Sequence, residues 1–266
     1  MKKTIGFIGM GNMAQAIAQG FIASGHILSD QLYAYAPNQD KLKNNAARIG
    51  FIPCASAMDV AAASDIIVMA CKPYQIETVL ADIAPLLPGK TLLSVALGWD
   101  YAKYQQHLLP GTRVQFIMPN TPAQIGQGVI QVCTLGASQD EMEEFVRLLA
   151  PAGLVDQIPE GLIDAASALS GCGPAFTYLF IEGLADGAVA CGLPRAQALA
   201  YAAQMVAGSA NLVLESGKHP GALKDAVCSP GGTTIQGVRA LEERGFRSAA
   251  MNAVIAAYEK TLSLSK

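Results

Sequence analysis

The stretch Thr4-Ile-Gly-Phe-Ile-Gly-Met-Gly-Asn-Met-Ala14 decides the fold of this chain. Thr4–Ile8 is an apolar run that predicts a first β-strand, and a GxGxxA pattern follows it directly. In this context the pattern is typical of a turn that binds a dinucleotide. Gly9 permits the tight turn, Gly11 removes a side chain that would block a pyrophosphate, and Ala14 lets the next helix pack closely on the strand. We therefore expect a pyrophosphate at the N-terminus of that helix.

Apolar runs alternate with helical stretches through the first half of the chain. The run over residues 65–71 is apolar after Asp65, as expected for a parallel strand covered on both faces. The alternation predicts an α/β fold with a doubly wound parallel sheet. The expected strands are Thr4–Ile8, Leu32–Ala36, Asp65–Cys71, Thr91–Val95, Arg113–Met118, Gly128–Val132 and Leu154–Gln157. The expected helices between them are Asn12–Ser24, Asp40–Ile49, Ala57–Ala63, Gln75–Leu87, Tyr101–Leu108 and one from Ser138 to about Leu149.

Strand signals stop after about residue 160. All later segments favour helices, rich in alanine and with long apolar faces. We therefore predict two domains, a dinucleotide-binding domain over residues 1–160 and an all-helical domain over residues 161–266. The apolar faces exceed what a lone bundle of this size needs, which indicates a buried dimer interface.

Composition excludes several classes of protein. The 266 residues are 52% hydrophobic and 15% charged, so general disorder is excluded. A net charge of −3 without a basic run argues against nucleic acid as a partner, and no apolar run approaches the length of a membrane span. Six cysteines without ligand spacing and three histidines make a metal site improbable and favour buried thiols in a reducing cytoplasm. Met-Lys-Lys-Thr at the start is interpreted as leading into a strand, not as a secretion signal.

The end of the second strand bears on cofactor choice. It is followed by Tyr35-Ala-Pro-Asn38, with no acidic residue before Asp40. Sites for NAD usually place a carboxylate here, where it would repel a 2′-phosphate. Its absence favours NADPH, and the lack of an arginine leaves the use of NADH open.

Two further loops fall at the carboxyl ends of strands, where open α/β sheets bind ligands. Ala70-Cys-Lys-Pro73 carries Lys72, which could contact a ribose or substrate oxygen or lie in solvent. Met118-Pro-Asn-Thr-Pro122 carries Asn120 and Thr121, for which ligand contact and loop capping are equally good interpretations.

A second glycine-rich loop, Ser229-Pro-Gly-Gly-Thr-Thr234, precedes an amphipathic helix near the other end of the chain. Gly231 and Gly232 expose backbone N–H groups, and the helix dipole adds positive potential. Because the loop contains no lysine or arginine, it suits a small carboxylate better than a second nucleotide.

The chain resembles the pyrroline-5-carboxylate reductases over essentially its whole length. The resemblance rests on Gly6-Phe-Ile-Gly-Met-Gly-Asn-Met13, Ala70–Pro73, Met118–Pro122, Leu169-Ser-Gly-Cys-Gly-Pro-Ala175, Gly245-Phe-Arg-Ser248 and above all His219-Pro-Gly-Ala-Leu-Lys-Asp-Ala-Val-Cys-Ser-Pro-Gly-Gly-Thr-Thr-Ile235. It implies a Rossmann-type domain plus a helical dimerisation domain, interlocked dimers that commonly form rings, and reduction of a cyclic imine carboxylate by NADPH to proline.

The resemblance also implies roles for particular residues. Those expected to hold the pyrophosphate are Ile8, Gly9, Met10, Gly11, Asn12 and Met13. Ala36 and Ser56 would lie near the adenosine 2′-phosphate, and Ala70, Cys71, Lys72 and Pro73 would line the path to the nicotinamide. The substrate carboxylate and ring nitrogen would be bound by Ser229, Gly231, Gly232, Thr233 and Thr234. Apart from the resemblance, Asn120 of the Met118–Pro122 loop is our further candidate for substrate binding. The late loop would meet the nucleotide across the dimer interface.

Thr234 is the expected catalytic residue, through a hydrogen bond to the ring nitrogen. A protonated C=N bond is already electrophilic, so no metal or covalent nucleophile is needed. No histidine or carboxylate is obviously placed as a general acid, and a threonine hydroxyl is a poor acid by itself. Most of the rate gain would then come from alignment of donor and acceptor.

Two other functions deserve comparison. A β-hydroxyacid dehydrogenase would share the first glycine pattern, but it needs a lysine where this chain has Thr177, four residues after Gly173. A nucleotide-sensing or scaffold protein would keep the fold without the chemistry, yet the Ser229–Thr234 loop is complete.

Overall fold

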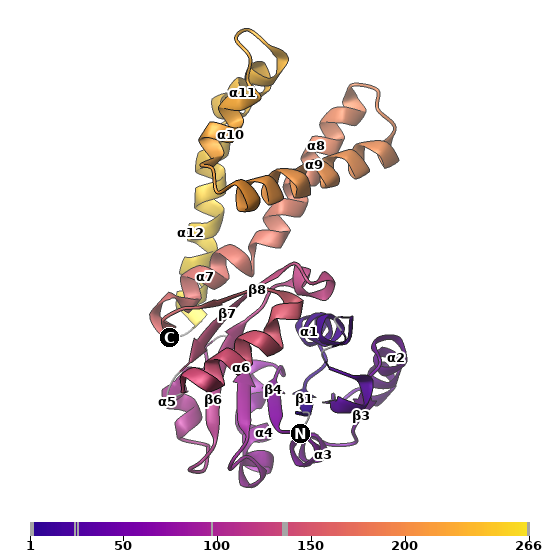
Figure 1. Ribbon diagram of the computed structural model, residues 1–266, viewed down its shortest axis with the longest axis vertical. Helices are drawn as coiled ribbons and strands as arrows, with labels where there is room; N and C mark the ends of the chain where they lie inside the picture. Colours follow the sequence, from indigo (N-terminus) through magenta and orange to yellow (C-terminus); the bar gives the residue numbers. More distant parts are fainter. Residues whose placement is uncertain (1–2, 24, 26, 97, 135–137, 265–266) are drawn as a thin grey trace. The chain divides into compact units, whose positions relative to one another are not determined.

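The structure is a computed structural model that describes residues 3–23, 25, 27–96, 98–134 and 138–264 (Figure 1). Its contacts divide the chain into two compact units, one of residues through Cys172 together with those from Tyr258 onward, the other Gly173–Ala257. The contacts group α7 (Ile163–Ser170) with the first unit. The sequence placed the boundary between two domains at residue 160, and that placement stays a prediction.

The first unit is built on an eight-stranded sheet in the order β3-β2-β1-β4-β5-β6-β7-β8. The strands are β1 Ile5–Ile8, β2 Leu32–Tyr35, β3 Ile52–Pro53, β4 Ile66–Met69, β5 Thr91–Ser94, β6 Arg113–Met118, β7 Gly128–Thr134 and β8 Gly153–Gln157. The strand order reverses beside β1, which pairs in parallel with β2 on one side and β4 on the other. This reversal creates a crevice at the carboxyl ends of β1 and β4.

The sheet differs from the prediction in two places. Strand β3 was not predicted, because a strand of only two residues, Ile52–Pro53, carries no periodic signal. Its proline is tolerated because β3 lies at the edge of the sheet. Strand β7 runs antiparallel to β6, so the sheet is mostly parallel with one antiparallel pairing. The connection between them holds only a 3₁₀ turn, Thr121–Ile125, which ends at Gly126 with φ 72°. Such a short link joins antiparallel neighbours, whereas a parallel crossover needs a longer connection.

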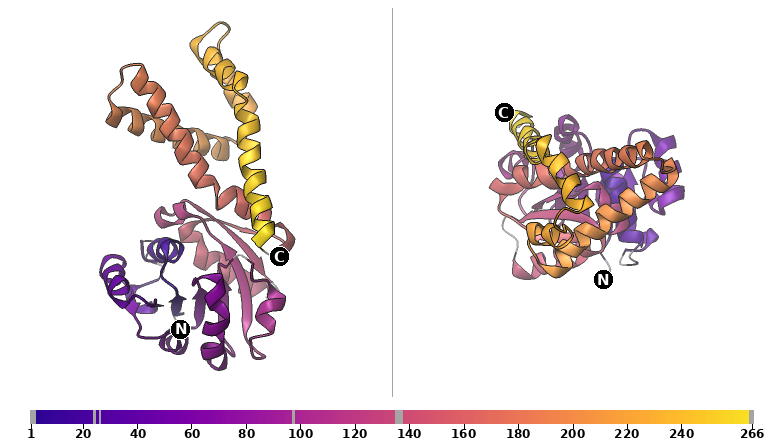
Figure 2. Two further views of the ribbon diagram at one scale, coloured as in Figure 1. Left: turned by 180° about the vertical axis from the view of Figure 1, so that it is seen from behind. Right: turned by 90° about the horizontal axis from the view of Figure 1, so that it is seen from above.

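Helices cover both faces of the sheet, as the doubly wound prediction requires (Figures 1 and 2). One face packs against α1 (Asn12–Ala23), α2 (Gln39–Ile49) and α6 (Gln139–Leu149). The other packs against α3 (Ala57–Ala63), α4 (Ile76–Ile83) and α5 (Tyr101–Gln105). Successive strand residues alternate between these two cores: Phe7 enters the first and Ile8 the second.

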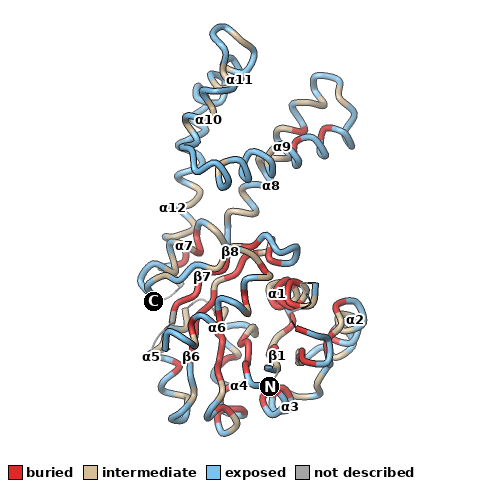
Figure 3. Tube along the Cα trace, viewed as in Figure 1, coloured by how far each residue is buried: buried red, intermediate tan, exposed pale blue. Residues whose placement is uncertain are grey.

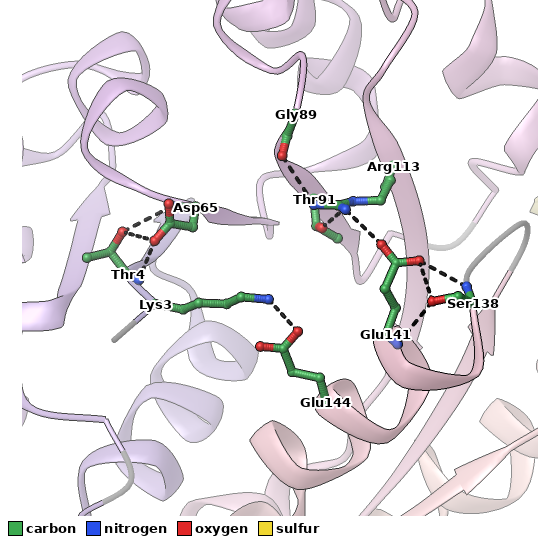
Figure 4. Close-up of polar contacts among 9 residues, drawn as sticks. All are labelled: Lys3, Thr4, Asp65, Gly89, Thr91, Arg113, Ser138, Glu141 and Glu144. Atoms are coloured by element: carbon green, nitrogen blue, oxygen red, sulfur yellow. Dashed lines mark hydrogen bonds and ion pairs between the residues drawn. The ribbon is translucent and has the colours of Figure 1, made fainter. Parts of the chain in front are cut away.

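Polar contacts tie the amino-terminal edge of the sheet together (Figure 4). Thr4 lies just before β1, and Asp65 lies just before β4. The Thr4 backbone N–H donates a hydrogen bond to Asp65 Oδ2 at 2.9 Å. Arg113, at the start of β6, donates to Thr91 Oγ1 at 3.2 Å and to Glu141 Oε1 at 2.7 Å. These contacts therefore fix the edge of the sheet opposite the crevice. The loops at the crevice stay available for a ligand.

The second unit is all-helical, as predicted. It contains α8 (Gly173–Ala190), α9 (Arg195–Ser216), α10 (Pro220–Ala226), α11 (Thr233–Glu243) and most of α12 (Phe246–Leu264). Helices α8 and α9 pack through Ala185, Ala198 and Ala202, the three buried apolar residues of this fully described unit. Figure 3 shows the contrast, with buried residues concentrated in the first unit. Within the described residues, no helix combines the length and the apolar character that a membrane crossing requires.

Candidate active site

The turn between β1 and α1 forms the floor of the site. Gly9 has φ 99°, and a Cβ there would lie 2.5 Å from the backbone of Ala70 and Cys71. Only glycine therefore lets the first turn meet the loop after β4. The Gly9 N–H donates to the Tyr35 carbonyl at 2.8 Å, and the Ala70 N–H donates to the Ile8 carbonyl at 2.8 Å. These bonds hold the ends of three neighbouring strands in fixed positions.

Gly11 is required for another reason. A Cβ built on Gly11 would have no atom within 4 Å, so it would project into open space at the start of α1. The first turn of α1 contains no acidic residue, so its backbone N–H groups present uncompensated positive potential. Ala14 is buried and brings the helix close to the sheet. These features fit the pyrophosphate of a dinucleotide.

A cleft of about 850 Å³ runs along this edge of the first unit. It contains all the predicted cofactor residues except Ser56. From the sequence predictions it holds Ile8, Gly9, Met10, Gly11, Asn12, Met13, Ala36, Ala70, Cys71, Lys72 and Pro73. It also includes residues that the sequence analysis did not name as cofactor-binding, namely Ala14, Tyr35, Pro37, Asn38, Lys41, Leu42, Asn45, Gln75, Val79, Val95, Ala96, Met118, Pro119, Thr121, Ser167, Gly171 and Cys172.

Lys41 is the most informative of the residues that sequence reasoning missed. It lines the cleft at the end next to β2, where the adenosine ribose of a dinucleotide lies. Asn38 caps α2 by accepting a hydrogen bond from the Lys41 N–H at 2.9 Å, which places Lys41 in the first helical turn. The signal in the sequence is a cation three residues after a capping asparagine, a lysine where an arginine is the more familiar partner of a 2′-phosphate.

Ser56 lies outside the lining of the cleft. Its hydroxyl accepts a hydrogen bond from the Asp59 N–H at 3.1 Å, and Asp59 accepts in return from the Ser56 N–H at 3.0 Å. This capping box starts α3 and occupies the hydroxyl. A contact of Ser56 with the cofactor therefore stays a prediction without support from this geometry.

Asn120 has a structural role that the sequence offered as an alternative. It is buried, and its amide group donates to the Ser170 carbonyl at 3.0 Å and accepts from the Val129 N–H at 2.9 Å. The loop after β6 is thereby tied to β7 and to the end of α7. The neighbouring Thr121 lines the cleft, whereas Asn120 does not. Its predicted contact with substrate stays a prediction.

The cleft holds no acidic side chain and no histidine among its described lining residues. Burial raises the pKa of the Cys71 thiol to about 11, so this group stays protonated at neutral pH. Lys72 is exposed at the mouth of the cleft. The first unit thus offers positions for a dinucleotide but no evident group for general acid catalysis.

The second glycine loop lies in the helical unit. Gly231 has φ 69°, and Gly232 is the N-cap of α11 with its N–H donating to the Ser229 carbonyl at 3.0 Å. A Cβ on Gly232 would lie 2.3 Å from Ser229 Oγ, so a larger residue there would require the serine side chain to turn away, whereas the positive φ of Gly231 favours glycine itself. Thr233 and Thr234 begin the helix and are exposed. The loop presents hydroxyls and a helix N-terminus to the outside of its unit.

Together the open sheet, the glycine turn at its switch point and the cleft define a class, the NAD(P)-dependent oxidoreductases with a Rossmann-type domain. Two family models agree with this class. The one described as NADP oxidoreductase coenzyme F420-dependent matches residues 4–98, and the one described as pyrroline-5-carboxylate reductase dimerisation matches residues 160–264.

Known proteins narrow the class to one family. The chain is 42% identical to the pyrroline-5-carboxylate reductase of Escherichia coli over 100% of both chains, and 40% identical to that of Methanosarcina acetivorans over 98% of both. The crystal structure of the Plasmodium falciparum pyrroline carboxylate reductase with NADP bound superposes with a TM-score of 0.90 at 33% identity, covering 100% of both chains. This chain belongs to the pyrroline-5-carboxylate reductase family. It is an NADP-dependent oxidoreductase whose dimerisation domain makes it a homo-oligomer.

Proposed function

We propose that this chain transfers hydride from NADPH to the C=N bond of L-1-pyrroline-5-carboxylate and forms L-proline, the last step of proline biosynthesis. The observation that carries the proposal is the 42% identity over the full length of a pyrroline-5-carboxylate reductase. Both glycine elements of the sequence are intact, and the first unit has the cleft that a dinucleotide needs.

For the cofactor, the N-terminus of α1 with Gly9 and Gly11 would hold the pyrophosphate. Lys41 would pair with the 2′-phosphate, since no carboxylate lines that end of the cleft. The Ala70–Pro73 loop would flank the nicotinamide at the other end. When bound, NADPH supplies the hydride.

For the substrate, the Ser229–Thr234 loop would bind the carboxylate through the N-terminus of α11 and its hydroxyls. Thr234 would donate a hydrogen bond at the ring nitrogen or relay a proton there. With no acidic side chain in the described lining of the cleft, catalysis would depend chiefly on holding donor and acceptor in alignment.

The resemblance to the family further suggests that the loop of one subunit completes the cleft of its partner. On this proposal the monomer is inactive, dimers assemble further into rings, and the enzyme works in the cytoplasm without nucleic acid as a partner.

The activity is tested by the loss of NADPH absorbance when pyrroline-5-carboxylate is added, with NADH measured alongside. We expect saturable oxidation, faster with NADPH. A dimeric sample that binds NADPH but does not oxidise it would refute the substrate, and the nucleotide-sensing role would then be the better interpretation.

Sharing of the site between subunits is tested by mixing two defective variants. Gly11→Asp would fill the pyrophosphate space with a carboxylate, and Thr234→Ala would remove the hydroxyl. After reversible dissociation and reassociation, random pairing should restore about a quarter of the wild-type activity, because each mixed dimer has one intact site. If one chain contained the whole site, mixing would restore nothing.

A further inference from the structure

Trp99 is the one tryptophan of the sequence, and it contacts the loop at the nicotinamide end of the cleft. Its indole Nε1–H donates to the Pro73 carbonyl at 3.1 Å. Pro73 closes the Ala70–Pro73 loop and starts a 3₁₀ turn, Pro73–Gln75. The indole is half-buried, yet its polar atom is directed to this one backbone group.

The indole is itself held by a row of aromatic rings, Trp99, Tyr104 and Phe116. The Trp99 and Tyr104 ring centroids lie 5.0 Å apart, and those of Tyr104 and Phe116 lie 5.7 Å apart. Tyr104 is fully buried in the core, and Phe116 belongs to β6. The row therefore connects the rigid sheet with the Pro73 carbonyl.

Tyr104 also contacts the loop that follows β5. The Tyr104 hydroxyl donates to Ser94 Oγ at 2.9 Å, and Ser94 Oγ accepts from the Ala96 N–H at 3.2 Å. Burial raises the pKa of Tyr104, so the phenol stays protonated and keeps its donor. Ala96 lines the cleft, as Pro73 does. Trp99, in the loop after β5, thus supports the loop after β4, and Tyr104 of α5 in turn supports the loop after β5.

These loops lie on the side of β1 that faces away from β2. Because the adenosine ribose of a dinucleotide lies by the second strand, the nicotinamide lies at this opposite end. We propose that Trp99 is a positioning residue for hydride transfer, which fixes the nicotinamide loop through the Pro73 carbonyl. This inference rests on the proposed function. It adds to the proposed active site a residue that belongs to none of the family motifs.

Small displacements at the reacting end are costly, because the rate depends steeply on the alignment of donor and acceptor. The 2′-phosphate position by Lys41 lies at the other end of the cleft from Pro73, and the N-terminus of α1 would hold the pyrophosphate, so both should hold the cofactor with or without the indole. The loss of the Trp99 hydrogen bond should therefore lower turnover more than it lowers cofactor affinity.

The test is Trp99→Phe, which keeps an aromatic ring and removes the N–H. We expect kcat to fall about 5- to 20-fold while the KM for NADPH stays within about 2-fold. The kinetic isotope effect with NADPH deuterated at C4 should rise, because hydride transfer becomes more rate-limiting. The control is His107→Ala, which removes the ring 5.6 Å from Trp99 and leaves the bond to Pro73 in place.

A readout without turnover uses the fluorescence of bound NADPH, excited directly in the nicotinamide. Trp99→Phe should lower this emission while the affinities for NADPH and for 2′,5′-ADP, which lacks the nicotinamide, stay unchanged. His107→Ala should match the wild type. Wild-type kcat and NADPH emission in Trp99→Phe would overturn the inference, as would losses in both variants that merely follow their losses of thermal stability. A wild-type protein without reductase activity would instead refute the proposed function, and the emission test would still apply.

Discussion

The two units of this chain differ most in how they bury their apolar residues. The first unit encloses two cores, one on each face of its sheet, with side chains such as Phe7, Phe21 and Leu80 fully buried. The helical unit buries only three alanines, and Leu214 and Leu179 are 77% and 71% exposed in the single chain. Apolar surface on this scale marks an interface. The first unit thus encloses its own apolar cores, whereas the helical unit leaves most of its large apolar residues exposed within one chain, as expected of a dimerisation domain.

The largest expected effect comes from placing charges on the apolar surface of the helical unit. Leu179→Glu with Leu214→Glu should abolish dimers and lower activity by at least about 100-fold, since unpaired charges cannot be buried in an interface. NADPH binding by the first unit should persist. Sedimentation, circular dichroism and NADPH titration check this together. Ile125→Glu, equally exposed at 71% but in the first unit, is the control that should stay dimeric.

The next effect concerns the proposed roles of the two units, with the cofactor bound by the first and the substrate by the helical unit. Thr234→Ala should lower kcat about 10- to 100-fold, less than the roughly 10²–10⁴-fold usual for a general acid because a threonine hydroxyl is a poor acid, with NADPH affinity unchanged. Thr177→Ala is the matched control, because that hydroxyl is bonded within α8 to the Gly173 carbonyl at 3.0 Å. Steady-state kinetics and cofactor titration distinguish the two. Unchanged turnover in Thr234→Ala would remove this residue from the mechanism.

Cofactor preference should depend on the first unit alone. Lys41→Ala should raise the KM for NADPH about 10-fold by removing one charge-assisted contact with the 2′-phosphate, and should leave the KM for NADH unchanged. Lys43→Ala, an exposed lysine of the same helix that does not line the cleft, should behave as the wild type. Equal losses with both cofactors would place the 2′-phosphate elsewhere.

The smallest effect concerns Cys71, a half-buried residue of the first unit. Because burial raises its pKa from 9.0 to about 11, the unfolded chain loses this proton first. The stability associated with the neutral thiol is complete below pH 9 and is lost as the pH rises toward 11. Cys71→Val should make the decline of the melting temperature over this range less steep. At pH 8 alkylation of Cys71 should be at least about 10-fold slower than that of the exposed Cys172.

Prediction from sequence succeeded where local signals are strong. The seven expected strands and the helices of both halves were confirmed in place, because apolar periodicity and glycine stops mark them locally. NADPH as cofactor agrees with the family. The antiparallel pairing of β7 with β6 could not be predicted, since a strand looks the same in sequence whichever way it runs.

For the candidate site too, some features follow from local sequence and others only from the tertiary structure. The sequence by itself determined the glycine turn after β1 and the Ser229–Thr234 loop, because the positive φ angles of Gly9 and Gly231 favour glycine and mark both turns locally. Only the tertiary structure decided which side chains line the cleft. Lys41 lines the cleft, whereas the side chains of Ser56 and Asn120 form hydrogen bonds with backbone groups of the fold. Trp99 meets Pro73 across 26 residues of sequence, a contact that no local pattern encodes because it arises from the packing of α5 beside the sheet.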